Sequence, residues 1–115
     1  MRVPTLPRLA RRAAAGARLL DRHEPGWQHR VDPDQLDAED VDRCVLGQLF
    51  GGYEPGLAEL AACRCDEVAA YHRDPVAWAA AHGFDLDVTE PRAAFRELTA
   101  AWRAELARRR GGARW

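Results

Sequence analysis

The sequence predicts an all-α fold, a small bundle of helices, and three observations lead to this prediction. Apolar residues recur at helical spacing near both ends of the chain, and an apolar run that ends in two glycines occupies its middle. Alanine fills 22 of the 115 positions, and all 17 basic residues are arginine. Both residue types favour helix, because alanine loses no side-chain entropy there and arginine loses little.

The first predicted helix covers residues 5–23, with Thr5 as its N-cap and Pro25-Gly26 as its stop. Its apolar residues follow the spacing of an amphipathic helix. They are Leu6, Leu9, Ala10, Ala13, Ala17 and Leu20.

A central helix follows a turn at residues 32–36, and Asp37 or Asp40 is expected to cap it. It runs to about Phe50, and Gly51-Gly52 supplies the left-handed residue that ends it. Gly47 inside this helix predicts close packing of a neighbouring backbone. The inner face is predicted to hold Val41, Cys44, Val45 and Leu49.

Short helices are expected next. Pro55 suits the first turn of one, Asp66 can cap a turn through Tyr71, and Asp74-Pro75 begins another that Gly83 ends. Residues of the first that should face inward are Leu57, Leu60 and Ala61.

Two segments alternate apolar and polar residues, as strands do. These are residues 27–31 and residues 84–88, and each is the only pairing partner available to the other. The sequence therefore leaves open a two-strand accessory hairpin beside the helices.

The last predicted helix is the most regular. Pro91 opens it, an apolar stripe includes Phe95, Leu98, Trp102 and Leu106, and it ends within residues 108–112. We expect one helical domain over residues 1–115, with residues 111–115 as a loose tail. The predicted core contains Val45, Leu49, Phe50, Trp78, Phe95 and Trp102.

The charge pattern along the chain is basic, acidic, basic. Residues 1–30 hold seven arginines against two acids, residues 31–90 three against fourteen, and residues 91–115 seven against two. If the two ends pack side by side, they form one positive face. The net charge of −1 gives no general attraction to nucleic acid. No signal peptide or membrane span is recognisable, so we expect a reduced, cytoplasmic location.

The sequence contains no complete catalytic or metal-binding set, so we expect a protein that is not an enzyme and has no cofactor. Cys44, Cys63, Cys65 and His72 are weak candidates for a zinc site, because Cys44 has no second ligand at the usual short spacing. Cys44 with His29 as base is a weak thiol-enzyme candidate, because the nearby carboxylates would raise the pKa of the thiol.

Binding to another macromolecule, either a protein or a second copy of the chain, uses the polarised charge best. The candidate surface includes Gln48 and Tyr53. The alternative is a nucleic-acid-binding regulator whose terminal arginines contact phosphates. The candidate residues are Arg11, Arg12, Arg108, Arg109 and Arg110, and the same stretches hold Arg8, Arg18 and Arg22.

Several motifs resemble those of small actinobacterial and phage proteins to which no activity is assigned. They are Gly26-Trp27, the run CVLGQLFG at residues 44–51, Gly83-Phe84-Asp85 and the run FRELTAAWR at residues 95–103. The resemblance covers most of residues 17–110 and implies no cofactor or catalytic residue. Kinship with phage proteins favours a regulatory or host-directed binding role.

Overall fold

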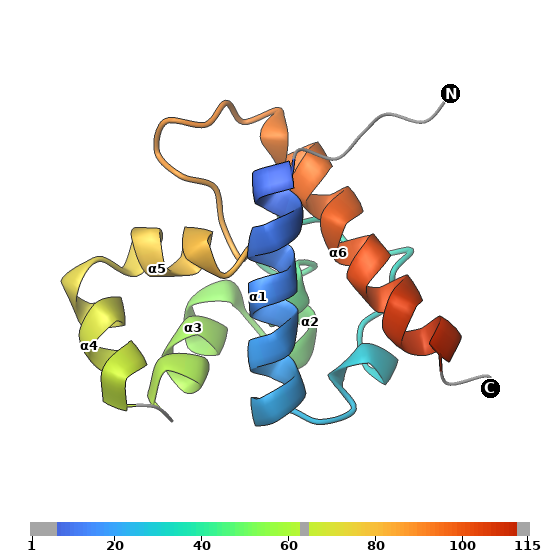
Figure 1. The fold of residues 1–115 in the computed structure, drawn as a ribbon, viewed down its shortest axis with the longest axis horizontal. Helices are drawn as coiled ribbons and strands as arrows, with labels where there is room; N and C mark the ends of the chain where they lie inside the picture. Colours follow the sequence, from blue (N-terminus) through green and yellow to red (C-terminus); the bar gives the residue numbers. More distant parts are fainter. Residues whose placement is uncertain (1–6, 63–64, 113–115) are drawn as a thin grey trace.

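The computed structural model describes residues 7–62 and 65–112, without the side chains of residues 65–67 and 112. The described part is a compact all-helical globule without strands, which confirms the predicted fold class (Figure 1). The predicted cap Thr5 lies outside these residues. The elements are α1 (Pro7–His23), the 3₁₀ helix η1 (Trp27–His29), α2 (Val45–Phe50), α3 (Tyr53–Ala62), α4 (Cys65–Arg73), α5 (Pro75–Ala81) and α6 (Ala94–Gly112).

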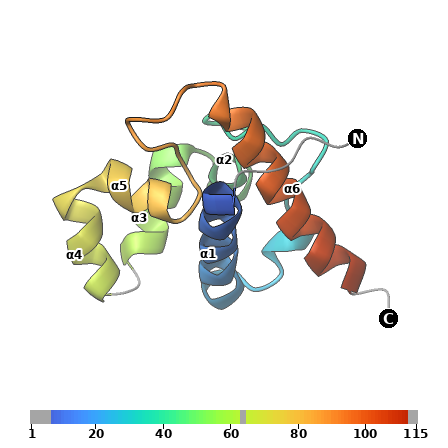
Figure 2. The ribbon, with the colours of Figure 1, turned by 45° about the horizontal axis from the view of Figure 1, so that its top comes forward.

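Helix α1 lies in the middle of the molecule, between α6 on one side and α3 to α5 on the other (Figures 1 and 2). It contacts α6 and α5, while α2 packs against α3 and α4 connects α3 to α5. Gly16 permits the close approach in α1, because a Cβ there would lie 2.0 Å from the carbonyl oxygen of His82 and 2.9 Å from the ring of Trp102. Of the predicted inward residues, Leu9, Ala13, Ala17 and Leu20 are buried and Ala10 is half-buried, whereas Leu6 lies outside the described residues.

The core is centred on aromatic rings from distant parts of the chain. Trp102 meets Trp27 edge to face at 5.8 Å between ring centres and stacks on Phe84 at 5.6 Å. Of the predicted core, Val45, Leu49, Trp78 and Trp102 are buried, and Phe50 and Phe95 lie half-buried at its edge. Trp27 is fully buried although the sequence placed it in the hairpin.

The prediction of a two-strand accessory hairpin is wrong. Residues 27–29 form a 3₁₀ helix and residues 84–88 an irregular loop. The loop's amides bind nearby carboxylates instead of a strand: Leu86 N–H donates to Asp85 at 2.8 Å and Asp87 N–H to Glu90 at 2.7 Å. Such local bonds compete with a sheet ladder. The apolar side chains that suggested alternation enter the core, except Val88, which is exposed.

The central helix is shorter than predicted, because it begins at Val45. Asp40 instead closes the turn before it, accepting hydrogen bonds from the amides of Asp42 at 2.8 Å and Arg43 at 3.1 Å. These amides lower the pKa of the Asp40 carboxyl, together with the Arg43 guanidinium. Val41 is consequently 58% exposed and not part of an inner face. The predicted stop is confirmed, since Gly51 has a left-handed φ of 84°.

The other helices follow the sequence with small shifts. Asp74 caps α5 by accepting from the amide of Ala77 at 3.1 Å, as predicted. Asp66 lies inside α4 and is not its cap. Helix α6 begins three residues after Pro91 and continues through Gly112, so residues 111 and 112 belong to the helix and not to a tail. The inward residues Leu57, Leu60 and Ala61 of α3 are buried.

A substitution at Gly47 tests how closely α2 packs against the turn that precedes it. A Cβ there would lie 2.4 Å from the carbonyl oxygen of Val41. We therefore expect Gly47→Ala to lower the free energy of unfolding by about 2 kcal/mol, because the steric clash costs more than alanine gains in helix propensity over glycine. Urea denaturation measures this. Gly111→Ala is the control, since nothing lies within 4 Å of its Cβ position. A stability of Gly47→Ala equal to that of the control would contradict the close contact.

Candidate functional site

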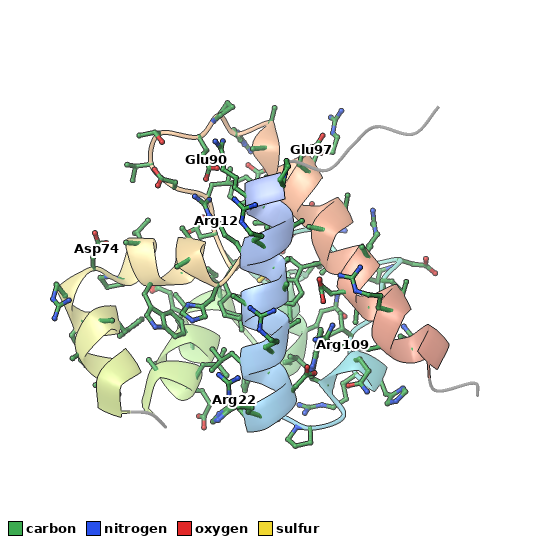
Figure 3. All side chains as sticks on the ribbon, in the orientation of Figure 1. Arg12, Arg22, Asp74, Glu90, Glu97 and Arg109 are labelled. Carbon is green, nitrogen blue, oxygen red and sulfur yellow. The ribbon has the colours of Figure 1, made fainter. Side chains whose placement is uncertain are left out.

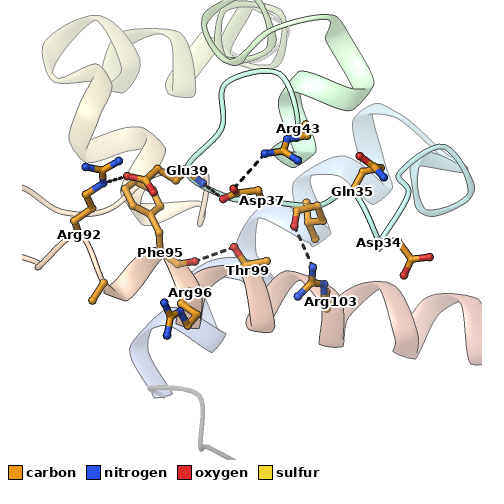
Figure 4. A pocket seen from close by; sticks show the side chains of 12 residues that line it. Asp34, Gln35, Asp37, Glu39, Arg43, Arg92, Phe95, Arg96, Thr99 and Arg103 are labelled. Atoms are coloured by element: carbon orange, nitrogen blue, oxygen red, sulfur yellow. Dashed lines mark hydrogen bonds and ion pairs between the residues drawn. The ribbon is translucent and has the colours of Figure 1, made fainter.

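A groove with a volume of about 600 Å³ lies between residues 34–43 and the start of α6 (Figure 4). Acidic side chains and Arg43 line the wall formed by residues 34–43, and arginines line the α6 wall, with the half-buried ring of Phe95 between them. The groove is therefore charged on both sides and has a small apolar floor. The lining residues that matter below are Asp34, Asp37, Glu39, Arg92, Phe95 and Arg96.

Three arginines on α6 stand seven residues apart and so lie on one side of the helix. We name Arg96, Arg103 and Arg110 the α6 arginine row. Arg103 donates to the carbonyl oxygens of Pro33 at 3.0 Å and Leu36 at 3.2 Å, and Arg110 to that of Val31 at 3.5 Å. Two members of the row thus fix the segment that leads into the groove.

Two further side chains hold the acidic wall through its main chain. The hydroxyl of Thr99 accepts from the amide of Ala38 at 2.9 Å and donates to the carbonyl of Phe95 at 2.9 Å. Gln48 accepts from the amide of Asp32 at 2.7 Å and donates to the carbonyls of Asp32 at 3.2 Å and Arg43 at 3.0 Å. Gln48, which the sequence nominated for binding, is therefore already occupied inside the chain.

The groove's ion pairs are exposed, with one arginine left over. Arg92 pairs with Glu39, and Arg43 with Asp37 at 3.8 Å and with Asp40. Arg96 is exposed and forms no side-chain hydrogen bond or ion pair with any residue that the structure describes. Sequence reasoning missed Arg96, although the heptad spacing of the α6 arginine row was a visible signal for it.

Tyr53 is half-buried and its hydroxyl donates to Asp85 at 2.6 Å. Burial and the neighbouring carboxylate both raise the pKa of Tyr53, so the hydroxyl stays protonated. A small cavity of about 80 Å³ lies beside it, near Cys44 and Phe95. The hydroxyl that the sequence nominated for binding instead joins α3 to the loop after α5.

Cys44 is buried and caps α2, because its sulfur accepts from the amide of Gly47 at 3.3 Å. Burial raises the pKa of its thiol, which opposes a reactive thiolate. Among residues 7–62 and 65–112, no group of three or more potential ligands could hold a metal ion. Of the other weak zinc candidates, His72 is exposed on α4, and Cys63 and the side chain of Cys65 lie outside the described residues.

The terminal arginines divide into engaged and free side chains. Arg12 and Arg8 each bind Glu90 at 2.8 Å, and Figure 3 shows Arg12 and Glu90 beside each other near the start of α1. The Glu90 side chain is only 3% exposed. Burial would raise its pKa, but the amide of Asp87 and the two guanidinium groups lower it overall. Arg12, nominated for phosphate binding, therefore fixes the 84–93 loop on α1.

Arg109 is also structural. It binds Asp21 at 2.8 Å and the buried Glu105 at 2.6 Å, and it lies 5.7 Å from the ring centre of Trp27. Its hydrogen bond lowers the pKa of the Asp21 carboxyl, and that carboxylate raises the pKa of Arg109. Arg108 pairs with Glu105 within α6, and Arg110 donates to the carbonyl of Val31, so all three arginines at the end of α6 have partners. Of the nominated arginines, Arg11 is exposed and makes no ion pair within the described part of the chain.

Comparison with protein-family models, with curated proteins and with solved structures found no match for this chain. The resemblance to actinobacterial and phage proteins thus stays a prediction. In the described ranges, no helix combines the length and apolar character needed to cross a membrane.

Glu90 predicts a specific acid dependence of stability. Because its pKa is lower folded than unfolded, its contribution is complete above about pH 5 and is lost as pH falls through the folded pKa. We expect Glu90→Gln to cost about 2 kcal/mol at pH 7 and less at pH 3, measured by urea denaturation. The exposed Glu54→Gln is the control. A cost that is the same at both pH values would contradict the ion-pair assignment.

The thiol of Cys44 should be unreactive in the native protein. In a Cys63→Ser/Cys65→Ser background, we expect a disulfide reagent at pH 8 to label less than a tenth of Cys44 in the time that labels it fully in urea, because burial protects the thiol. The absorbance of the released thiolate measures this reaction. Rapid stoichiometric labelling of the native protein would show an accessible sulfur.

Proposed function

We propose that this protein is a protein-binding module whose groove receives an extended acidic segment of a partner protein. The observation that carries the proposal is Arg96, an exposed arginine that lines the groove without an ion pair among the described residues. Beside it, the ring of Phe95 offers apolar contact area. An unpaired guanidinium next to an aromatic ring is a combination typical of protein interfaces.

The α6 arginine row supports an extended main chain as the occupant. Arg103 already binds two main-chain carbonyls, those of Pro33 and Leu36, and Arg110 binds a third. Arg96 lies two helical turns before Arg103. At this level residues 34–43 are no longer in contact with the α6 arginine row and form the opposite wall of the groove (Figure 4). A partner segment in this place would present its own carbonyl or carboxylate oxygens to the remaining arginine.

The charges of the α6 wall support an acidic occupant. Arg92 lies one turn before Arg96 and binds only Glu39, and the side chains of this pair are 84% and 37% exposed. Exposed ion pairs contribute about 0 to 1 kcal/mol, so a partner carboxylate can replace Glu39 at low cost. Asp34 and Asp37 on the opposite wall would repel acidic groups and orient them toward α6.

A pair of labelled peptides tests the proposal. We expect a fluorescein-labelled dodecapeptide of six Glu-Val repeats, which favours extended backbone, to bind in an anisotropy titration. Arg96→Ala should weaken binding about tenfold, the value of one lost charge-assisted hydrogen bond. Arg73→Ala is the matched control, because Arg73 is an exposed arginine on α4 outside the groove.

A dodecapeptide of six Lys-Val repeats separates charge recognition from general peptide binding. It should not bind, because the guanidinium groups of Arg92, Arg96 and Arg103 line the wall that would receive it. Equal affinity for the two peptides, or an Arg96→Ala variant that binds as the wild type does, would refute the proposed site.

A further inference from the structure

The outward side of α1 carries three arginines in one line. At 3.6 residues per turn, Arg11, Arg18 and Arg22 fall within about 40° of one another and span roughly 16 Å along the helix axis. All three are exposed, whereas the leucines of the same helix are buried on its other side. We name these three residues the α1 arginine face. Figure 3 labels Arg22 near the C-terminal end of α1.

This face keeps its charge. None of its three arginines forms a hydrogen bond or ion pair with a residue in the described ranges. Two carboxylates that contact α1 have other hydrogen-bond partners. Asp21 accepts from Arg109 and from the indole of Trp27, although it also attracts Arg22 through space, and Glu90 accepts from Arg8 and Arg12. The fold therefore uses the local acids elsewhere and leaves about three positive charges facing solvent.

The fold itself does not explain these arginines. None of the three forms a hydrogen bond or ion pair with a described residue, and the half-buried Ala14 and Ala15 between them have short side chains. Short neighbours let all three guanidinium groups reach one flat or convex surface. Guanidinium groups bind phosphate oxygens through two parallel hydrogen bonds, which makes phosphate the ligand group that suits the face best.

The remaining residues of α1 distinguish among the possible sources of phosphate. Helix α1 contains no Phe, Tyr or Trp, so it offers no ring on which the bases of a single strand could stack. Its leucines are buried, so no large apolar side chain can enter a lipid surface. A duplex presents a phosphate about every 3.4 Å along each strand, and the length of the face spans several of them. We propose that the α1 arginine face binds the phosphate backbone of double-stranded nucleic acid.

This site is independent of the groove. Its arginines belong to α1, whereas the groove is lined by α6 and residues 34–43. No base contact is implied, so the binding is non-specific and its strength depends on salt. With three phosphates neutralised, the affinity should fall about 40-fold between 50 and 200 mM salt.

The test is an anisotropy titration of the full chain with a fluorescein-labelled 20-base-pair DNA duplex in 50 mM NaCl. We expect binding, and at least tenfold weaker binding by the Arg11→Gln/Arg18→Gln/Arg22→Gln variant. The matched control is Arg30→Gln/Arg43→Gln/Arg73→Gln, which removes the same charge from exposed positions outside α1 and should bind within twofold of the wild type. Circular dichroism checks the helix content of both variants, and the single change Arg18→Gln should weaken binding two- to threefold in case the triple variant unfolds.

Three results would overturn the proposal. One is no binding to the duplex at 50 mM NaCl. Another is an equal loss of DNA affinity in the control variant, which would show that the net charge of the protein, and not the α1 arginine face, determines binding. The last is tighter binding to a 20-nucleotide single strand, or to phosphatidylserine vesicles, than to the duplex.

Discussion

The position of the Trp102 side chain is the constraint on which the rest of the structure depends. Its ring lies against Gly16 of α1, meets Trp27 edge to face and stacks on Phe84, and its Nε1 donates to the carbonyl of Gly83 at 2.5 Å. One side chain thus sets the distance between α1 and α6 and fixes the two irregular segments beside them. The placement of α6 in turn decides where the α6 arginine row stands and which wall of the groove it forms.

Many of the charged side chains form ion pairs within the folded chain. Acids and arginines that are far apart in sequence meet at helix junctions, as in the pairs of Glu90 with α1 and of Asp21 with Arg109. These pairs are partly shielded and hold loops and helix ends in place. The arginines that remain unpaired in the described part of the chain are therefore informative. The α1 arginine face and Arg96 lie on two separate surfaces, and Arg73 on α4 is a further exposed arginine without a partner among the described residues.

Much of the helical architecture could be predicted, because periodicity, caps and glycine stops are local signals. The central acidic segment could not, since its aspartates bind nearby amides and form turns where a longer helix was expected. The candidate site was harder still. Gln48, Arg12 and Arg109 are polar residues for which the sequence suggested free side chains, yet each has a partner that lies 16, 78 or 88 residues away, respectively. Such long-range pairs cannot be recognised from the neighbouring sequence. From the sequence we therefore proposed side chains that already have partners in the fold and overlooked Arg96.

Three side chains hold the acidic wall of the groove in place, and each of them binds main-chain atoms of the wall. Arg103, Thr99 and Gln48 contact carbonyl oxygens and amides of residues 32–43, and none of these bonds depends on which side chains that segment carries. The path of the wall is thus separated from its chemistry. Descendants of this chain could replace the exposed residues of the segment and acquire new partner preferences while the scaffold that presents them stays unchanged.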